Sequence, residues 1–378
     1  SACFMGLGAG LSDSASQLVQ SCAQFTSNGP GNKLLLANIN IPSSNWVPLF
    51  SDSKTLFMLL DVAIVTFGFI GLIWGADKFV AGASAIAFNF GVAPLMIGLT
   101  IVAIGTSAPE FFSSAVAAIE NQAPIAIGNA LGSNLFNIGV ALGVATLIRP
   151  ITPPGSLVRR ELPVLLIVTV VTGLVFANLY IGIIDSLVLL ALLALCVYAL
   201  VRRGLRGEAA PALVDPEEEA DIPAISTTRA CLRLLIGLVL LIIGAEALVG
   251  GASSIAERLG VSSAIIGLTI VALGTSLPEL AACVTSVVRG HSDLALGNVV
   301  GSNILNLLVV LPFPGLLAAG PIEQELFYRD YATMLAMTVV LAGTCFWTIK
   351  SGKRIGRSFG IVFLLMYALW FSIMYQQI

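Results

Sequence analysis

Two glutamates occupy positions where a free carboxylate is energetically unfavourable. Glu110 and Glu279 each lie near the middle of a long apolar stretch. An ionised carboxylate at the centre of a membrane-spanning helix costs at least about 2.5 kcal/mol on insertion scales. The apolar stretches that surround the pair carry no Lys or Arg away from their ends, so a bound cation is the expected partner. The alternative is a pair of protonated glutamates that only hold helices together.

The neighbours of each glutamate supply further oxygen atoms. Thr106, Ser107 and Glu110 are spaced i, i+1 and i+4, which predicts one side of a helix. The same spacing recurs at Thr275, Ser276 and Glu279. Hard cations such as Ca²⁺ and Na⁺ require oxygen ligands, and no imidazole or thiolate joins the set. The Thr-Ser pair alone also fits hydroxyls that bond back to a helix carbonyl.

A proline precedes each glutamate directly. Pro109 and Pro278 have no backbone N–H, so the carbonyls of Gly105 and Gly274 lose their helical donors. Broken helices in transporters point such freed carbonyl oxygens at a bound ion. The prolines therefore predict a break in each glutamate-bearing helix.

A second polar segment follows each glutamate. Residues 128–137 read GNALGSNLFN and residues 297–306 read GNVVGSNILN. Each segment places a serine and an asparagine four residues apart on one helix face, which are Ser133 with Asn137 and Ser302 with Asn306. These pairs can offer neutral oxygens beside a glutamate, although a role in helix packing alone is also open. Glycines at 128, 132, 297 and 301 predict close approach of helices.

These motifs belong to an internal repeat. Residues 98–110 read GLTIVAIGTSAPE and residues 267–279 read GLTIVALGTSLPE, at an offset of 169 residues. The ungapped match extends from 75–140 to 244–309. Matching halves of this kind are typical of secondary transporters, in which the substrate site lies where the halves meet.

The composition places the chain in a membrane. Of 378 residues, 57% are hydrophobic and 10% are charged, with a mean hydropathy of +0.98, which excludes an ordinary soluble domain. Apolar runs of about 20 residues are long enough for helices to cross the hydrocarbon core. The sequence predicts ten spans, at 55–80, 93–119, 123–147, 161–178, 180–201, 230–256, 262–288, 293–316, 330–349 and 357–376.

The expected fold is an all-α integral membrane protein with ten transmembrane helices in two inverted-topology five-helix repeats. The expected domains are an external N-terminal tail at 1–54, a first repeat at 55–202, an acidic cytoplasmic linker at 203–228 and a second repeat at 229–378. Five spans per half reverse the direction in which the second half crosses the membrane.

The charged residues and cysteines refine this topology. Thirteen of the 18 Lys and Arg fall in predicted loops on one side and four on the other, so the positive-inside rule puts both termini outside. No basic cluster suggests a nucleic-acid partner. Cys3 and Cys22 both fall in the external tail, where a disulfide between them is possible.

Through GTSAPE, GTSLPE and the paired GN..GSN..N segments, the sequence resembles the calcium/cation antiporter superfamily, in its prokaryotic-type sodium/calcium exchanger branch. The resemblance covers nearly all of residues 55–378. It implies a central site made by spans 2, 3, 7 and 8, with spans 1 and 6 sliding across it. The implied ligands are Glu110 and Glu279 with the Thr106 and Thr275 backbone oxygens for Ca²⁺, and Ser107, Ser133, Ser276 and Ser302 with the Ala103 and Ala272 carbonyls for Na⁺, beside Asn137. Some relatives carry Asp where this chain has Asn306, and Asn favours independence from potassium.

The sequence thus predicts a secondary active antiporter that exchanges sodium for calcium by alternating access. The resemblance implies three Na⁺ per Ca²⁺, hence electrogenic exchange in which sodium entry exports calcium. A compact chain without a large regulatory domain predicts a bacterial inner membrane. The expected partners are the two ions and the lipid bilayer, with no cofactor and no obligate protein partner.

Three alternatives remain open. A proton/calcium antiporter would use the same two glutamates, although relatives of that branch carry the acid in a GN..E pattern. A cation channel would need a continuous polar pore, whereas the paired motifs favour a carrier. An enzyme is the least expected, because the single histidine, His291, lies in a predicted cytoplasmic loop beside Arg289 and no nucleophile-base set is visible.

Overall fold

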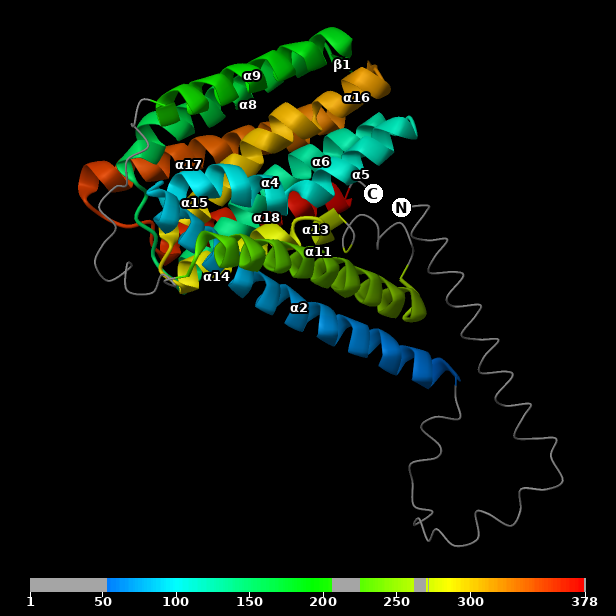
Figure 1. The fold of residues 1–378 in the computed structure, drawn as a ribbon. Coiled ribbons are helices and arrows are strands. Elements are labelled where there is room, and N and C mark those ends of the chain that lie inside the picture. The colour runs from blue at the N-terminus through cyan, green and yellow to red at the C-terminus, as the bar shows by residue number, and fades with distance from the viewer. Residues whose placement is uncertain (1–52, 206–224, 262–269, 271, 377–378) are drawn as a thin grey trace, which may run out of the picture. The chain divides into compact units, whose positions relative to one another are not determined.

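The computed structural model describes residues 53–205, 225–261, 270 and 272–376, and most of them are helical (Figure 1). The chain divides into two units, Ser1–Leu60 and Asp61–Ile378, and the arrangement given below is that of the second unit. The proposed Cys3–Cys22 disulfide, almost all of the predicted tail and most of the acidic linker lie outside the described residues.

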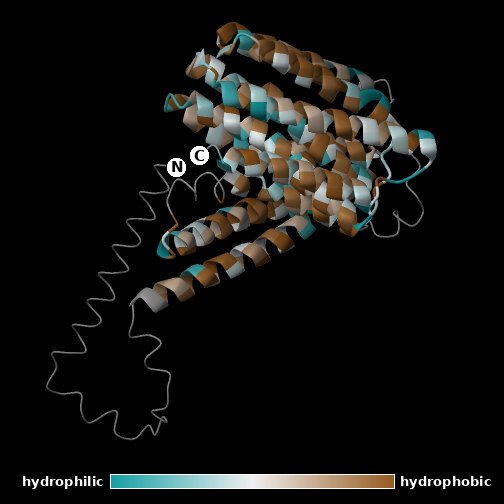
Figure 2. Cartoon of the chain, turned by 180° about the vertical axis from the view of Figure 1, so that it is seen from behind, coloured by the Kyte–Doolittle hydropathy of each residue, from teal (hydrophilic) through white to brown (hydrophobic). Residues whose placement is uncertain are grey.

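Long apolar helices dominate the described part of the chain. Seven are long and apolar enough to cross a membrane, namely Leu56–Phe90, Ala123–Ile148, Ile183–Arg202, Thr227–Arg258, Ser292–Leu317, Leu326–Ser351 and Arg357–Gln376. An eighth span results if the bent pair Pro94–Thr106 and Ala108–Ile119 is counted as one. Figure 2 shows hydrophobic residues along most of the length of these helices, and many, such as Phe112 and Ile184, are exposed. A helical membrane protein is therefore confirmed, with fewer qualifying spans than the ten predicted.

Helices α2 (Ser53–Phe90) and α11 (Thr227–Arg258) form an antiparallel pair in backbone contact (Figure 1). Glycines recur every seven residues along the contact, at Gly68, Gly75 and Gly82 on α2 and at Gly237, Gly244 and Gly251 on α11. A Cβ on Gly75 would lie 2.7 Å from the backbone nitrogen of Leu241. Only glycine permits so close an approach, so the backbones of the two helices lie in direct contact along these glycines.

Two ion pairs tie α2 to other helices. Arg258 donates from Nε to Asp61 Oδ2 at 2.7 Å, near the end of α11. Arg289 donates from Nε to Asp77 Oδ1 at 3.0 Å, and its Nη2 also contacts that oxygen. Helix α2 continues to Phe90, ten residues beyond the predicted end of the first span, so Asp77 lies inside a helix.

The first glutamate-bearing segment is a broken helix. It consists of α3 (Pro94–Ile97), η3 (Gly98–Val102, a π-helical turn), α4 (Ala103–Thr106) and α5 (Ala108–Ile119). The chain bends by 46° between α4 and α5, where Ser107 adopts φ −82° and ψ 6°. This confirms the break predicted from Pro109. In the second half, Thr275 and Ser276 separate α13 (Ala272–Gly274) from α14 (Leu277–Val288).

Two further helices carry the GN..GSN..N segments. The first is α6 (Ala123–Phe136), which continues as η4 (Asn137–Leu142) and α7 (Gly143–Ile148). The second is α15 (Ser292–Leu305), which continues as η7 (Asn306–Val310) and α16 (Pro312–Leu317). Each changes to a π-helical turn at its last asparagine. Turns of this type inside helices often mark functional sites.

The predicted close approach of glycines is confirmed on α15. A Cβ on Gly297 would lie 2.5 Å from the carbonyl oxygen of Leu95, and one on Gly301 would lie 2.7 Å from that of Leu99. On α6, a Cβ on Gly128 would meet only a side-chain atom of Leu326, at 3.8 Å. Gly297 contacts Leu95, Gly98 and Leu99, and their repeat mates at 264, 267 and 268 lie outside the described part, so a tight contact at Gly128 stays a prediction. Gly132 has no described atom within 4 Å, and residues 262–269, which match 93–100, lie outside the described part.

The remaining elements surround these core helices. They are η5 (Leu157–Glu161), α8 (Leu162–Phe176), β1 (Tyr180–Ile181), α9 (Ile183–Leu205), β2 (Gly320–Pro321), η8 (Leu326–Tyr331), α17 (Ala332–Ser351) and α18 (Arg357–Gln376). Strands β1 and β2 pair antiparallel, with Tyr180 opposite Pro321. This short ladder joins a loop of the first half to a loop of the second.

The contact between α3 and α15 gives a stability prediction. Gly297→Ala forces a Cβ against the Leu95 carbonyl, so we expect a loss of about 1–3 kcal/mol of folding free energy from overpacking. Thermal unfolding of the detergent-solubilised protein measures this loss as a lower Tm. Gly343→Ala is the control, because Gly343 is exposed on α17 and a Cβ there would meet no described atom within 4 Å. Equal Tm values for the two variants would contradict the contact.

Candidate functional site

The two glutamates begin helices rather than interrupt them. Glu110 lies in the first turn of α5 and is fully buried, and Glu279 lies in the first turn of α14 and is 1% exposed. The helix breaks that precede them therefore place each carboxylate near a helix N-terminus, where the helix dipole favours negative charge. Neither glutamate forms an ion pair within the described part of the chain.

Serines from opposite halves bind the two carboxylates. Ser276 Oγ donates to Glu110 Oε1 at 2.9 Å, and Ser107 Oγ donates to Glu279 Oε1 at 2.9 Å. Each serine therefore belongs to the half that carries the other glutamate. This exchange brings α4, α5 and α14 together at one buried point.

The serines of the second motif complete the group. Ser302 Oγ lies 3.0 Å from Ser107 Oγ, and Ser133 Oγ lies 3.0 Å from Ser276 Oγ. Ser133 also reaches Glu110 Oε1 at 3.4 Å. The structure therefore gathers two carboxylates and four hydroxyls, and none of these residues is more than 3% exposed.

Several buried oxygens at this place lack a hydrogen-bond partner among the described residues. They are Glu110 Oε2, Glu279 Oε2, Asn137 Oδ1, Asn306 Oδ1 and Thr275 Oγ1. A buried acceptor without a donor costs about 1–3 kcal/mol, more when it is charged. Carboxylate and amide oxygens can only accept, so their natural partner is a cation. Among the described residues, no three His, Cys, Asp or Glu side chains lie close enough together to hold a metal ion. The other ligands of such a cation would therefore be neutral.

The remaining predicted site residues lie on the same broken helices. Thr106 Oγ1 donates to Asn298 Oδ1 at 3.1 Å. The carbonyl of Ala103 accepts the backbone N–H of Ser107 at 3.0 Å and keeps one lone pair for another partner. Ala272 begins α13, three residues before Thr275.

The two halves of the site are not equivalent. The Thr106 hydroxyl is paired with Asn298, whereas the hydroxyl of its repeat mate, Thr275, has no described partner. Asn129, the repeat mate of Asn298, instead donates to Ser114 Oγ at 2.8 Å and to the Glu110 carbonyl at 3.3 Å. The sequences also differ at this point, because the repeat mate of Ser114 is Cys283, which offers no hydroxyl to Asn298.

The sequence analysis did not place four asparagines at the site. They are Asn129, Asn134, Asn298 and Asn303, and all belong to the repeated segments. Their presence at the same offset in both halves was the signal that could have found them.

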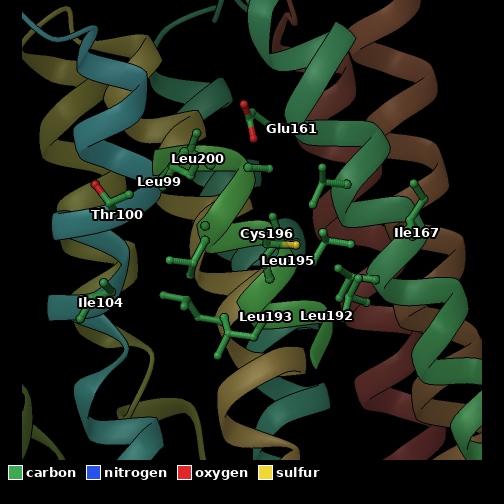
Figure 3. A pocket seen from close by; sticks show the side chains of 17 residues that line it. Leu99, Thr100, Ile104, Glu161, Ile167, Leu192, Leu193, Leu195, Cys196 and Leu200 are labelled. Carbon is green, nitrogen blue, oxygen red and sulfur yellow. The ribbon is translucent and has the colours of Figure 1, made fainter. Parts of the chain in front are cut away.

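An apolar pocket elsewhere has different chemistry. It encloses about 460 Å³ between η3, α8, α9 and α15, and Figure 3 shows Leu99, Ile104 and Leu193 along it. Glu161 is the only acidic residue in its lining, which is otherwise almost wholly apolar. The pocket therefore lacks the oxygen atoms that a cation needs.

The fold and the site define a class: a helical membrane protein with a buried cluster of oxygen atoms drawn from two related segments. The family described as sodium/calcium exchanger protein matches residues 60–202 and 230–376. The chain is 40% identical over 313 residues to the putative antiporter CaxA of Alkalimonas amylolytica, covering 82% of this chain and 97% of that protein. It is 36% identical over 320 residues to the inner membrane protein YrbG of Escherichia coli (strain K12), covering 84% and 98%.

A solved structure is similar over the same range. The sodium-calcium exchanger NCX_Mj, soaked with Na⁺ and Ca²⁺, matches with a TM-score of 0.71 and 33% identity, over 83% of this chain and 98% of that chain. The chain belongs to the sodium/calcium exchanger family. This is a family of transporters rather than enzymes, and the protein is a membrane antiporter of calcium and other cations.

The free oxygens at Glu279 give a second prediction. Glu279→Gln removes one of two buried negative charges, so without Ca²⁺ we expect the variant to be at least as heat-stable as the wild type. A ligand at a hundred times its Kd stabilises the folded state by about 2.7 kcal/mol, so Ca²⁺ should raise the Tm of the wild type but not of the variant.

The matched control is Glu120→Gln, which changes an exposed glutamate just beyond the end of α5. This variant should respond to Ca²⁺ as the wild type does. An equal Ca²⁺-induced shift in Glu279→Gln would show that the carboxylate does not hold the ion.

Proposed function

We propose that the protein is a secondary active antiporter that exchanges Na⁺ for Ca²⁺ by alternating access and exports calcium from the cytoplasm. The observation that carries the proposal is the buried pair of carboxylates, each bound by a serine hydroxyl of the opposite half and each with an Oε2 atom that has no described partner. Membership of the sodium/calcium exchanger family supports the choice of ions.

The proposed ligands divide between the two ions. Ca²⁺ is held by Glu110 and Glu279 with the backbone oxygens of Thr106 and Thr275. Na⁺ is held by Ser107, Ser133, Ser276 and Ser302 with the carbonyls of Ala103 and Ala272, beside Asn137 and Asn306. The serine hydroxyls lie within hydrogen-bond distance of the carboxylate oxygens and of each other. A cation bound at one proposed site would therefore displace the ligand oxygens of the neighbouring site, which supports one shared set of ligands for both ions.

Charge compensation couples the two ions in this proposal. One Ca²⁺, or several Na⁺ that occupy overlapping oxygens, neutralises both carboxylates. A site with two uncompensated charges resists crossing the membrane, because unpaired buried charge is costly. The loaded forms therefore move and the empty form does not. Three Na⁺ for one Ca²⁺ would move one net charge per cycle.

The proposed architecture is ten spans in two inverted repeats, at 55–202 and 229–378, with the tail at 1–54 and both termini outside. Two further segments support spans beyond the eight that qualify by length and composition. Residues 157–176 are helical through η5 and α8, and α14 follows residues 262–269, which the described part omits.

Alternating access is supported by the two related halves of the site, each of which contributes a serine to the glutamate of the other. The glycine contact between α2 and α11 would let this pair slide as one body over the core. The proton/calcium alternative uses the same carboxylates, since protons can also neutralise them.

Calcium uptake into sodium-loaded proteoliposomes tests the exchange. We expect radioactive Ca²⁺ uptake that requires an outward Na⁺ gradient, persists without potassium, and falls to background in Glu110→Gln and Glu279→Gln. Glu120→Gln should transport normally. Uptake driven equally well by a pH gradient alone would favour the proton/calcium alternative.

The charge moved per cycle is tested separately. If three Na⁺ leave for each Ca²⁺ that enters the vesicle, one positive charge leaves, so an inside-positive potential should accelerate Ca²⁺ uptake. The driving force is about 2.3 kcal/mol per charge for each 100 mV. The measurement is the initial uptake rate at potentials set by a potassium ionophore. A rate that does not respond to potential would contradict electrogenic exchange.

A further inference from the structure

Four buried asparagines link the two halves next to the carboxylates. Asn134 and Asn137 lie on α6 and η4, and Asn303 and Asn306 lie on α15 and η7. Each is at most 1% exposed. Asn134 matches Asn303 in the repeat and Asn137 matches Asn306, so the set contains two related pairs.

The first pair is oriented by the backbone. Asn134 Nδ2 donates to the carbonyl oxygen of Asn303 at 3.2 Å, and Asn303 Nδ2 reaches the carbonyl oxygen of Asn134 at 3.5 Å. A backbone carbonyl can only accept a hydrogen bond, so each side-chain amide must present its NH₂ group to it. The side-chain oxygens of Asn134 and Asn303 are therefore turned away from these carbonyls.

The second pair is oriented by the first. Asn306 Nδ2 donates to Asn134 Oδ1 at 3.1 Å, and Asn137 Nδ2 donates to Asn303 Oδ1 at 3.1 Å. An amide oxygen accepts only, so Asn137 and Asn306 must also present NH₂ groups to their partners. Their own oxygens are the atoms left without a partner among the described residues.

We propose that Asn134 and Asn303 are positioning residues that make Asn306 and Asn137 present oxygen, rather than NH₂, to the bound cation. This inference rests on the proposed function of the site. Asn137 follows Ser133 by four residues, and Ser133 contacts Glu110 and Ser276. A reversed amide would direct its N–H groups at a site built from acceptors and would repel the cation.

The relay also accounts for four asparagines where two ligands would suffice. An asparagine is nearly symmetric in shape, so packing alone does not decide which end faces the ion. The hydrogen-bond chain decides it, because it begins at backbone carbonyls whose polarity cannot change. Supporting residues of this kind typically affect metal affinity by about 10–100-fold.

The test is equilibrium binding of radioactive Ca²⁺ to the purified full chain. Asn134→Ala removes the acceptor for the Asn306 amide, so we expect Ca²⁺ affinity to fall roughly tenfold. In an Asn306→Asp background both side-chain oxygens can accept, and orientation no longer matters. There, the same Asn134→Ala change should alter Ca²⁺ affinity less than about twofold. The difference between its effects in the two backgrounds is the coupling that a double-mutant cycle measures.

The matched control combines each alanine substitution with the Asp substitution at the ligand to which that asparagine is not bonded. Asn137→Asp should rescue Asn303→Ala but not Asn134→Ala, because each ligand has its own partner. Thermal unfolding without Ca²⁺ establishes that each variant is folded.

Two results would overturn the inference. They are an unchanged affinity in Asn134→Ala, and an equal loss with and without Asn306→Asp. In both cases wild-type binding stays intact and the proposed function stands. If the folded wild type binds no Ca²⁺, the proposed function itself fails, and the positioning role fails with it.

Discussion

Two buried carboxylates that pair with no cationic side chain of the described residues are the constraint on which this structure depends. Glu110 and Glu279 receive hydrogen bonds from serine hydroxyls, and the Oε2 atom of each has no described partner. Such a site is stable with both charges present only when something positive enters it. The same need links binding to movement, because the membrane penalises the empty site more than the loaded one.

The helices around the glutamates are built to assemble this site from distant parts of the chain. Breaks at Ser107 and at Thr275–Ser276 put both carboxylates at helix starts. Glycines on α15 bring that helix into contact with η3, and the glycines of α2 and α11 hold the outer pair together. Each half contributes a serine to the other half's glutamate, so neither half has a complete site alone. The pairing of Thr106 and Thr275 is unequal, and the halves also differ in sequence beside them, because Ser114 matches Cys283.

Much of this was predictable, for physical reasons that are local. Apolar runs, the missing N–H of Pro109 and the repeat itself indicated spans, a helix break and a paired site before any coordinates. The predicted end of the first span, at residue 80, falls ten residues before the end of α2. The charged residues Asp77 and Lys78 resemble the end of a helix, whereas Asp77 is paired with Arg289 and the helix continues to Phe90. The asparagine relay was beyond reach, because its bonds join residues 166–172 positions apart and depend on which end of each amide faces which partner. The tight contact expected at Gly128 stays a prediction, because its expected partners lie outside the described residues.

The central claim is that one set of oxygens holds either Ca²⁺ or Na⁺ and never both at full occupancy. Equilibrium binding of radioactive Ca²⁺ to the purified protein, titrated with Na⁺ at constant ionic strength, tests it most directly. The account predicts complete displacement of a single Ca²⁺ with a steep dependence on Na⁺, since more than one Na⁺ replaces it. Binding of Ca²⁺ that stays unchanged as the sites fill with Na⁺ would contradict the account.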